Sequence, residues 1–147
     1  MDWLAADPTG MGSMNTLIIG DLNSYDKEDP IDAVLAGADD EISTQDDFLD
    51  LIYSFVGEEA YGYVFDGQVG YLDHALANKW LFNQITGTTI WHINADEPDL
   101  IDYDTSFKKD AQDALYVADQ YRSSDHDPVI IGMTLKTYQF YLPIINK

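Results

Sequence analysis

The apolar run at residues 129–131 constrains the fold most, because a valine followed by two isoleucines favours a buried strand. Asp125 and His126 come just before this run, with Pro128 between them and the strand. Both side chains are therefore predicted to lie on a loop that enters a core strand, where a rigid scaffold can hold them. A carboxylate beside an imidazole offers a metal ligand and a proton acceptor. Without further support, such a pair is more often part of a solvated loop.

A second strand is predicted at residues 16–20, where Thr-Leu-Ile-Ile-Gly forms a short apolar segment. The segment ends at Asp21 and Asn23, whose side chains are two residues apart and are expected to point to the same side. Two interpretations stay open here. The pair either makes turn hydrogen bonds or presents polar groups at the edge of a site.

A third strand is predicted at residues 61–65, followed by a hairpin turn at residues 66–68 and a returning strand at residues 71–77. Asp73 interrupts this returning apolar strand, and a charge in a buried strand has to be paired or functional. His74 is expected to point to the opposite face and to have a structural role.

The remaining chain alternates short predicted helices and loops. The apolar residues Phe48, Leu51, Ile52 and Phe55 have helical spacing, and a short helix or turn is predicted from Lys79. Residues 107–120 form a polar insertion, and a strand is predicted at residues 128–135. With 147 residues, the chain is long enough for one domain with its own core. The fold class expected is mixed α/β, of the α+β type.

The charge balance limits the kind of ligand that the chain can bind. The formal net charge is −20, with 27 acidic residues against 7 lysines and arginines, which argues against ordinary electrostatic binding of phosphates. The acidic residues either form a solvated surface or hold hard divalent cations. The sequence has no cysteine, which excludes disulfides and thiolate metal sites. No apolar run reaches the roughly 20 residues of a membrane span, so no membrane partner is expected.

Three short motifs occur in the order Gly20-Asp21-Leu22-Asn23, Leu72-Asp73-His74 and Ser124-Asp125-His126. Together they resemble the pattern of the endonuclease/exonuclease/phosphatase superfamily, whose members include DNase I-like nucleases. The longer blocks at residues 63–76, 91–98 and 121–129 are similar to extracellular bacterial nucleases of the ExeM and NucH type.

The resemblance covers residues 1–135 and implies the C-terminal half of a DNase I-like four-layer α/β sandwich. It implies a mainly antiparallel sheet with flanking helices, while residues 136–147 are expected to be a tail or linker. The other half of such a domain would carry an asparagine, a metal-binding glutamate and a phosphate-binding histidine. A separate N-terminal half or a second copy of the chain is therefore an expected partner.

The resemblance also implies a role for each motif residue. His126 would be the general base or phosphate contact, and Asp73 would fix its tautomer. Asp21 would position the attacking water or bind metal, and Asn23 would stabilise the transition state. Asp125 would bind Mg²⁺, with Mn²⁺ or Ca²⁺ as alternatives. The implied substrate is nucleic acid, DNA rather than RNA, and the implied location is extracellular.

Two other hypotheses stay open. One is a phosphomonoesterase or lipid-phosphate phosphatase of the same superfamily, and the other is a non-catalytic acidic domain that binds cations. The isolated chain is expected to bind Mg²⁺ weakly and to have little activity. Convergence of Asp21, Asn23, Asp73 and His126 in space would favour catalysis, whereas scattered positions would exclude it.

Overall fold

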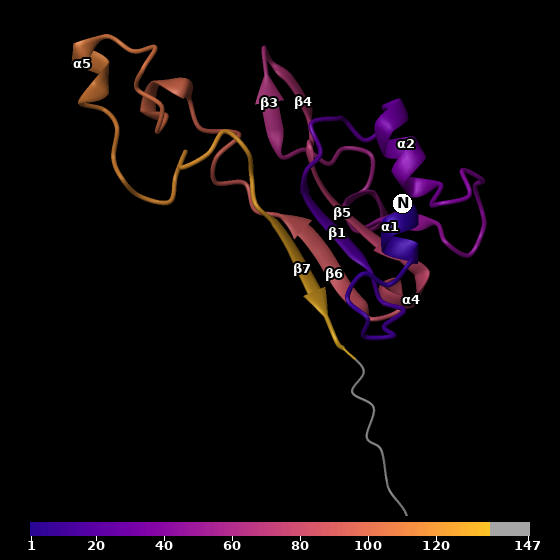
Figure 1. Cartoon of the computed structure of the whole chain (residues 1–147). Helices are drawn as coiled ribbons and strands as arrows, with labels where there is room; N and C mark the ends of the chain where they lie inside the picture. Colours follow the sequence, from indigo (N-terminus) through magenta and orange to yellow (C-terminus); the bar gives the residue numbers. More distant parts are fainter. Residues whose placement is uncertain (136–147) are drawn as a thin grey trace, which may run out of the picture.

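A computed structural model of the chain describes residues 1–135, so the predicted tail at residues 136–147 lies outside the described residues (Figure 1). The architecture is mixed α/β with small antiparallel sheets and short helices, which confirms the α+β class. No helix within residues 1–135 is long and apolar enough to cross a membrane.

The largest sheet has the order β1-β5-β2 and is antiparallel throughout. Its strands are β1 (Leu17–Asp21), β5 (Asp73–Asn78) and β2 (Phe48–Asp50). Central strand β5 is buried along residues 74–77, because sheet neighbours flank it on both sides and its apolar residues face the core. The register places Asp21 directly opposite Asp73. The predicted strand at residues 16–20 is thus confirmed to within one residue, and Asp73 begins a strand instead of interrupting one.

A second sheet pairs β6 (Ile85–Ile90) with β7 (Val129–Met133). Strand β7 confirms the strand predicted from the β-branched run. Strand β6 was not predicted, because its sequence Ile-Thr-Gly-Thr-Thr-Ile has no continuous apolar run or strict alternation. Pairing with β7 supplies the backbone partners that its local sequence does not specify.

The hairpin prediction is correct at its turn and wrong about its second strand. Strand β3 (Tyr63–Phe65) pairs with β4 (Gln68–Gly70), and Asp66 and Gly67 between them both have positive φ. The strand predicted at residues 71–77 belongs to the larger sheet instead. Its alanines and leucine are fully buried there, which a small solvent-exposed hairpin could not achieve.

The helices are all short. They are α1 (Asp2–Ala5), α2 (Asp29–Leu35), α3 (Leu51–Phe55), α4 (Lys79–Phe82), a 3₁₀ turn η1 (Asp99–Ile101) and α5 (Asp110–Asp113). The predicted helical face that began at Phe48 is wrong at its start. Asp50 caps α3 by accepting the Tyr53 N–H at 3.0 Å, so Phe48 lies in strand β2.

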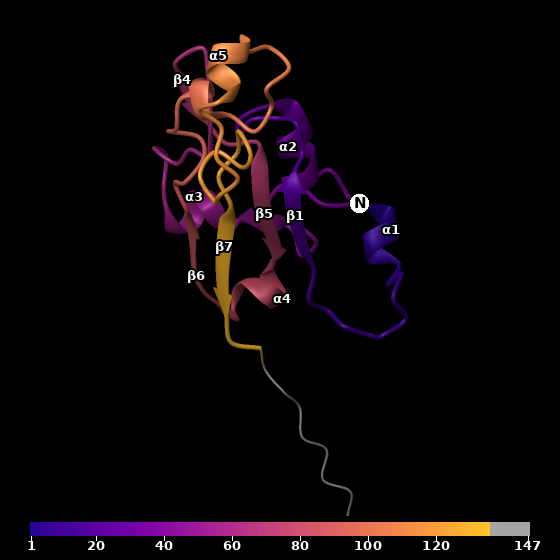
Figure 2. The same ribbon diagram turned by 90° about the vertical axis from the view of Figure 1, so that its left-hand side faces the viewer.

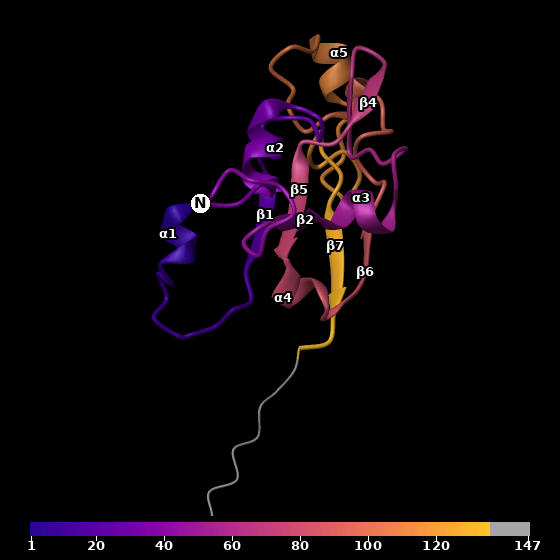
Figure 3. The ribbon, with the colours of Figure 1, turned by 90° about the vertical axis from the view of Figure 1, so that its right-hand side faces the viewer.

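The core lies between α3 and the two sheets. Leu51 and Ile52 of α3 are fully buried and pack in one cluster with Ala75, Ala77 and Ile90. Figures 2 and 3 show α3 beside β5 and β6. Each fully buried aliphatic side chain contributes about 1.5–3 kcal/mol of transfer free energy. This cluster fixes the larger sheet against the β6–β7 pair, and both sheets carry predicted site residues at one end.

Candidate active site

Three separate segments meet where β1 ends and β5 begins. Asp21 and Asp73 are opposite residues of the antiparallel ladder, which Leu22 extends by donating its N–H to the Leu72 carbonyl at 2.9 Å. Asp73 also binds His126, with 2.5 Å between Oδ2 and the imidazole Nδ1. Since a carboxylate can only accept, Nδ1 carries the proton of this hydrogen bond. Residues that are distant in sequence therefore form one polar cluster.

Asn23 joins this cluster through Asp21. Its backbone N–H donates to Asp21 Oδ1 at 2.7 Å, and its side-chain Nδ2 donates to Asp21 Oδ2 at 3.2 Å. The Asn23 backbone has φ of 52°, a left-handed conformation that asparagine tolerates better than most residues. This turn brings the amide back beside the strand end. The four catalytic residues predicted from sequence thus converge in space.

Tyr63 lies against His126. The two residues form an isolated antiparallel bridge, and their ring centroids are 4.5 Å apart. His126 Nδ1 is occupied by Asp73, and Nε2 has no hydrogen-bond partner among residues 1–135. The half-buried imidazole therefore presents Nε2 as its available nitrogen.

The charges of both predicted metal-binding carboxylates affect the pKa of Tyr63. Burial raises the pKa of Tyr63 above its ordinary value, and the negative charges of Asp125 and Asp21 raise that pKa further. Asp125 is half-buried and adjoins His126 in the chain.

The protein side chains near the site do not form a complete metal cage. Within residues 1–135, no three histidine, aspartate or glutamate side chains gather closely enough to hold an ion. Mg²⁺ is commonly held by one or two carboxylates together with water and phosphate oxygens. Asp21 and Asp125 are the two carboxylates predicted for such an arrangement, in which substrate oxygens would complete the coordination.

Asp127 organises the loop beneath His126, and the sequence did not reveal this role. Its Oδ1 accepts the backbone N–H groups of Ile93, Asn94 and Ala95 at 2.8–3.1 Å, and its Oδ2 accepts His92 Nδ1 at 2.8 Å. The side chain is fully buried. One carboxylate thus fixes a four-residue turn that lies more than thirty positions earlier in the chain.

Asn94 completes this support for the loop that carries Asp125 and His126. Its Nδ2 donates to the His126 carbonyl at 2.6 Å, and its Oδ1 accepts the Ser123 N–H at 3.2 Å. Asn94 itself is buried, which shields its end of both bonds from water. The backbone on either side of Asp125 is therefore held by one amide side chain. The block at residues 91–98 entered the sequence analysis only through the family resemblance, and this role of Asn94 was not predicted.

Arg122 ties down the long connection between β6 and β7, which extends away from the sheets in Figure 1. The buried guanidinium donates to Asp102 at 2.7 Å, to Asp99 at 2.5 Å and to the Asn94 carbonyl at 3.1 Å. Asp102 is itself buried, so this ion pair neutralises a charge that would otherwise be costly. The network anchors the connection beside the loop that carries Asp125 and His126.

His74 is fully buried on the face opposite Asp73 and its Nε2 donates to the Ser24 carbonyl at 2.8 Å. Its other nitrogen, Nδ1, lies 3.8 Å from Asp50 Oδ2 and has no hydrogen-bond partner. Because Nε2 already carries a proton, Nδ1 is protonated only in the charged imidazolium. Burial lowers the pKa of His74, but Asp50 and the Ser24 carbonyl outweigh burial and raise it overall. These contacts fit the predicted structural role.

We expect the Asp50→Asn variant to lose about 1–3 kcal/mol of unfolding free energy near pH 5–6. Burial raises the pKa of Asp50, but His74, the Tyr53 N–H and Tyr71 lower it overall. The Asp50 contribution is therefore lost as pH falls through its lowered folded-state pKa. The His74 contribution is complete below its unfolded pKa and is lost as pH rises through its raised folded pKa. Urea unfolding between pH 3 and pH 9 measures this, and a pH-independent loss would contradict it.

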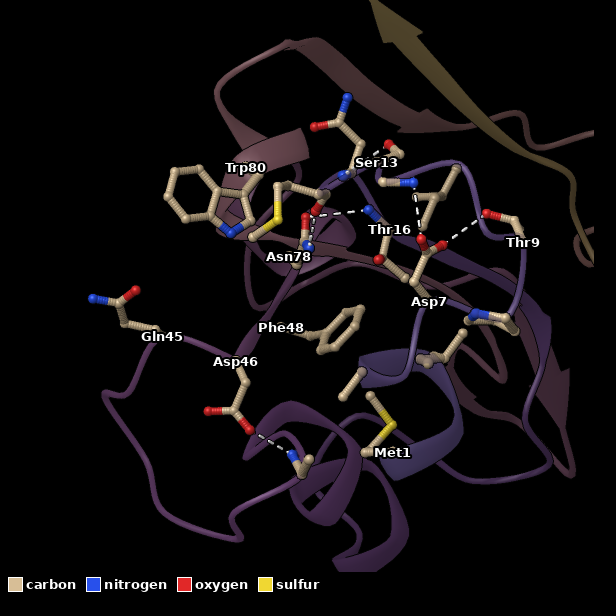
Figure 4. Close-up of a pocket in the computed structure, with 18 residues that line it drawn as sticks. Met1, Asp7, Thr9, Ser13, Thr16, Gln45, Asp46, Phe48, Asn78 and Trp80 are labelled. Atoms are coloured by element: carbon tan, nitrogen blue, oxygen red, sulfur yellow. Dashed lines mark hydrogen bonds between the residues drawn. The ribbon is translucent and has the colours of Figure 1, made fainter.

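A cavity of about 570 Å³ lies away from these residues, between the N-terminal segment and the larger sheet (Figure 4). Phe48 and Trp80 line it, and Asn78 bridges its wall by accepting the Thr16 N–H at 3.3 Å. None of the predicted site residues lines this cavity.

No family model, no curated protein and no solved structure matches this chain. The α+β class therefore rests on the structure, and the chemistry has to be inferred from the geometry of the site.

Proposed function

We propose that the chain hydrolyses phosphodiester bonds of nucleic acid with the help of a divalent metal ion. The observation that carries this proposal is the meeting of Asp21, Asn23, Asp73 and His126 from three separate segments at one strand end. A histidine oriented by a carboxylate, beside a second carboxylate and an amide, supplies the proton acceptor and hydrogen-bond donors that hydrolysis requires.

His126 is assigned the central role because its Nδ1 is occupied by Asp73 while Nε2 is available. The carboxylate of Asp73 fixes the tautomer and stabilises the imidazolium that forms when Nε2 takes a proton. Nε2 then contacts the scissile phosphate or accepts a proton from the attacking water. This division of roles explains why a carboxylate stands at the first residue of a buried strand.

Asp21 and Asn23 act on the nucleophile and the phosphate. The Asp21 carboxylate is exposed and positions or deprotonates the water. The Asn23 amide, held by the left-handed turn, donates to the non-bridging oxygens as negative charge builds. When Mg²⁺ is bound, with Mn²⁺ or Ca²⁺ as alternatives, it neutralises the phosphate and stabilises the leaving oxygen. Asp125 and Asp21 are the residues that would hold it.

The same proposal includes a DNase I-like half-domain. Its support is that β1 and β7 each pair along one edge only within residues 1–135, which leaves edges to which further strands could add. A separate N-terminal half or a second copy would occupy those edges and complete the metal site. Extracellular action and a preference for DNA over RNA rest on the sequence resemblance alone.

A phosphomonoesterase acting on a small or lipid phosphate is the second candidate. The net charge of −20 favours it, because a long polyanion is repelled more strongly than a single phosphate group. The non-catalytic cation-binding hypothesis is less favoured, because it gives no reason for the Asp73–His126 pair.

Hydrolysis of a fluorescently labelled oligonucleotide and of p-nitrophenyl phosphate distinguishes these candidates. We expect slow oligonucleotide cleavage in Mg²⁺ that EDTA abolishes, with little release of p-nitrophenol. The reverse substrate preference would favour the phosphomonoesterase. The absence of both activities, in a chain that circular dichroism shows to be folded, would contradict hydrolysis by the isolated chain.

A further inference from the structure

Aromatic side chains alternate along one short extended segment beside the catalytic histidine. Tyr61, Tyr63 and Phe65 are each two residues apart, so strand geometry points them to the same side. Tyr63 contacts the His126 ring, as described above, and Tyr61 stacks on the His92 ring at 4.4 Å with 19° between their planes. The row of rings therefore starts at the proposed catalytic site.

Phe65 is the outer member of this row and is largely uncovered. Its side chain is 60% exposed, although burying a phenylalanine would be favourable. Its ring lies 6.3 Å from that of Tyr63, with only 14° between the two planes. Figure 1 shows the β3–β4 hairpin projecting beyond β1 and β5, so its tip is accessible to a large ligand.

The charge of the chain requires an unusual source of affinity for nucleic acid. Proteins usually bind the phosphate backbone through lysine and arginine, but here 7 such residues stand against 27 acidic ones. Arg122 is moreover buried in ion pairs with Asp99 and Asp102. Stacking on bases does not depend on positive charge, because every base has a π face.

We propose that Tyr63 and Phe65 form a stacking platform for the unpaired bases of single-stranded nucleic acid. Their ring centroids are 6.3 Å apart with 14° between the planes, so the two rings offer neighbouring, near-parallel surfaces on which bases can stack. A strand bound in this way leads directly to His126, which touches Tyr63. The proposal rests on the proposed function for its ligand class, and it specifies single strands over duplexes.

Fluorescence anisotropy with labelled dT8 and with an eight-base-pair duplex tests this platform, in Mg²⁺ and with phosphorothioate linkages that resist hydrolysis. We expect Phe65→Leu, which keeps apolar surface but loses the ring, to weaken dT8 binding at least fivefold. Phe65→Tyr keeps the ring and should bind as the unaltered chain does. Because Phe65 is exposed, both variants should fold, and circular dichroism checks this.

Two outcomes would overturn the platform, namely wild-type dT8 affinity in Phe65→Leu, or equal affinity of the unaltered chain for dT8 and duplex. The salt dependence is a further test, since a platform based on stacking predicts no steep loss of dT8 affinity as salt rises. A steep loss would assign the affinity to phosphate contacts and would also overturn the platform.

The platform and the proposed hydrolysis can fail independently. Cleavage that depends on His126, together with unchanged dT8 affinity in Phe65→Leu, would refute the platform while leaving the proposed hydrolysis intact. Binding that depends on Phe65, without any cleavage, would support the platform and contradict the proposed hydrolysis.

Discussion

Replacing His126 by alanine is expected to lower the rate of Mg²⁺-dependent oligonucleotide cleavage by about 10²–10⁴-fold. The reason is that Nε2 is the available nitrogen of an imidazole whose other nitrogen is held by Asp73. The variant removes the proton acceptor but leaves the core cluster intact, because His126 packs against Tyr63 outside that cluster. Single-turnover cleavage assays measure the change.

Asp73→Asn is the companion variant. An amide can still occupy the same space, but it cannot stabilise a charged imidazolium, so a smaller loss of rate than that of His126→Ala is expected. His74→Gln serves as a control, because His74 is buried on the opposite face of the strand. Cleavage that is as slow in a folded His74→Gln variant as in His126→Ala would contradict the assignment of His126.

Replacing Asp127 by alanine is expected to give the largest loss of stability, about 3–5 kcal/mol of unfolding free energy. The buried carboxylate is the partner of three backbone N–H groups and of His92. Its removal leaves buried donors unsatisfied, and each such donor costs about 1–3 kcal/mol unless the loop opens to water. Guanidinium unfolding followed by circular dichroism measures the loss.

Asp125→Ala is the matched control for this prediction. Asp125 is only half-buried and makes no hydrogen bond through its carboxylate within residues 1–135, so its loss should change stability little. Similar stability losses in Asp125→Ala and Asp127→Ala would show that the buried hydrogen bonds of Asp127 do not make the expected contribution to the free energy of unfolding. Since Asn94 and Asp127 hold the backbone around His126, Asp127→Ala should also slow cleavage.

The sequence predicted those parts of the structure that local patterns specify. The apolar runs before Asp21 and after Pro128 predicted β1 and β7, because short runs rich in β-branched residues favour buried strands. The apolar strand predicted that Asp73 is paired or functional, and the family resemblance implied that its partner is His126. The structure contains that pair.

The parts that the sequence did not predict depend on tertiary contacts. Strand β6 is rich in threonine and glycine and becomes a strand through its pairing with β7. Nothing in the local sequence distinguishes Asp127 from the other acidic residues of its loop. Only the folded chain brings its carboxylate to the N–H groups of residues 93–95. The strand predicted at residues 71–77 joins the core sheet, because burial of its small apolar residues outweighs continuation of the hairpin.

The central claim is that Asp73 acts through His126 in one hydrolytic site, and a double-variant cycle tests it most directly. The measurement is the cleavage rate of a labelled single-stranded oligonucleotide in Mg²⁺ by the unaltered chain, Asp73→Asn, His126→Ala and the double variant. The predicted result is a double variant no slower than His126→Ala alone, because Asp73 has no role once the imidazole is gone. Rate losses that multiply, or a rate that does not depend on His126, would contradict the claim.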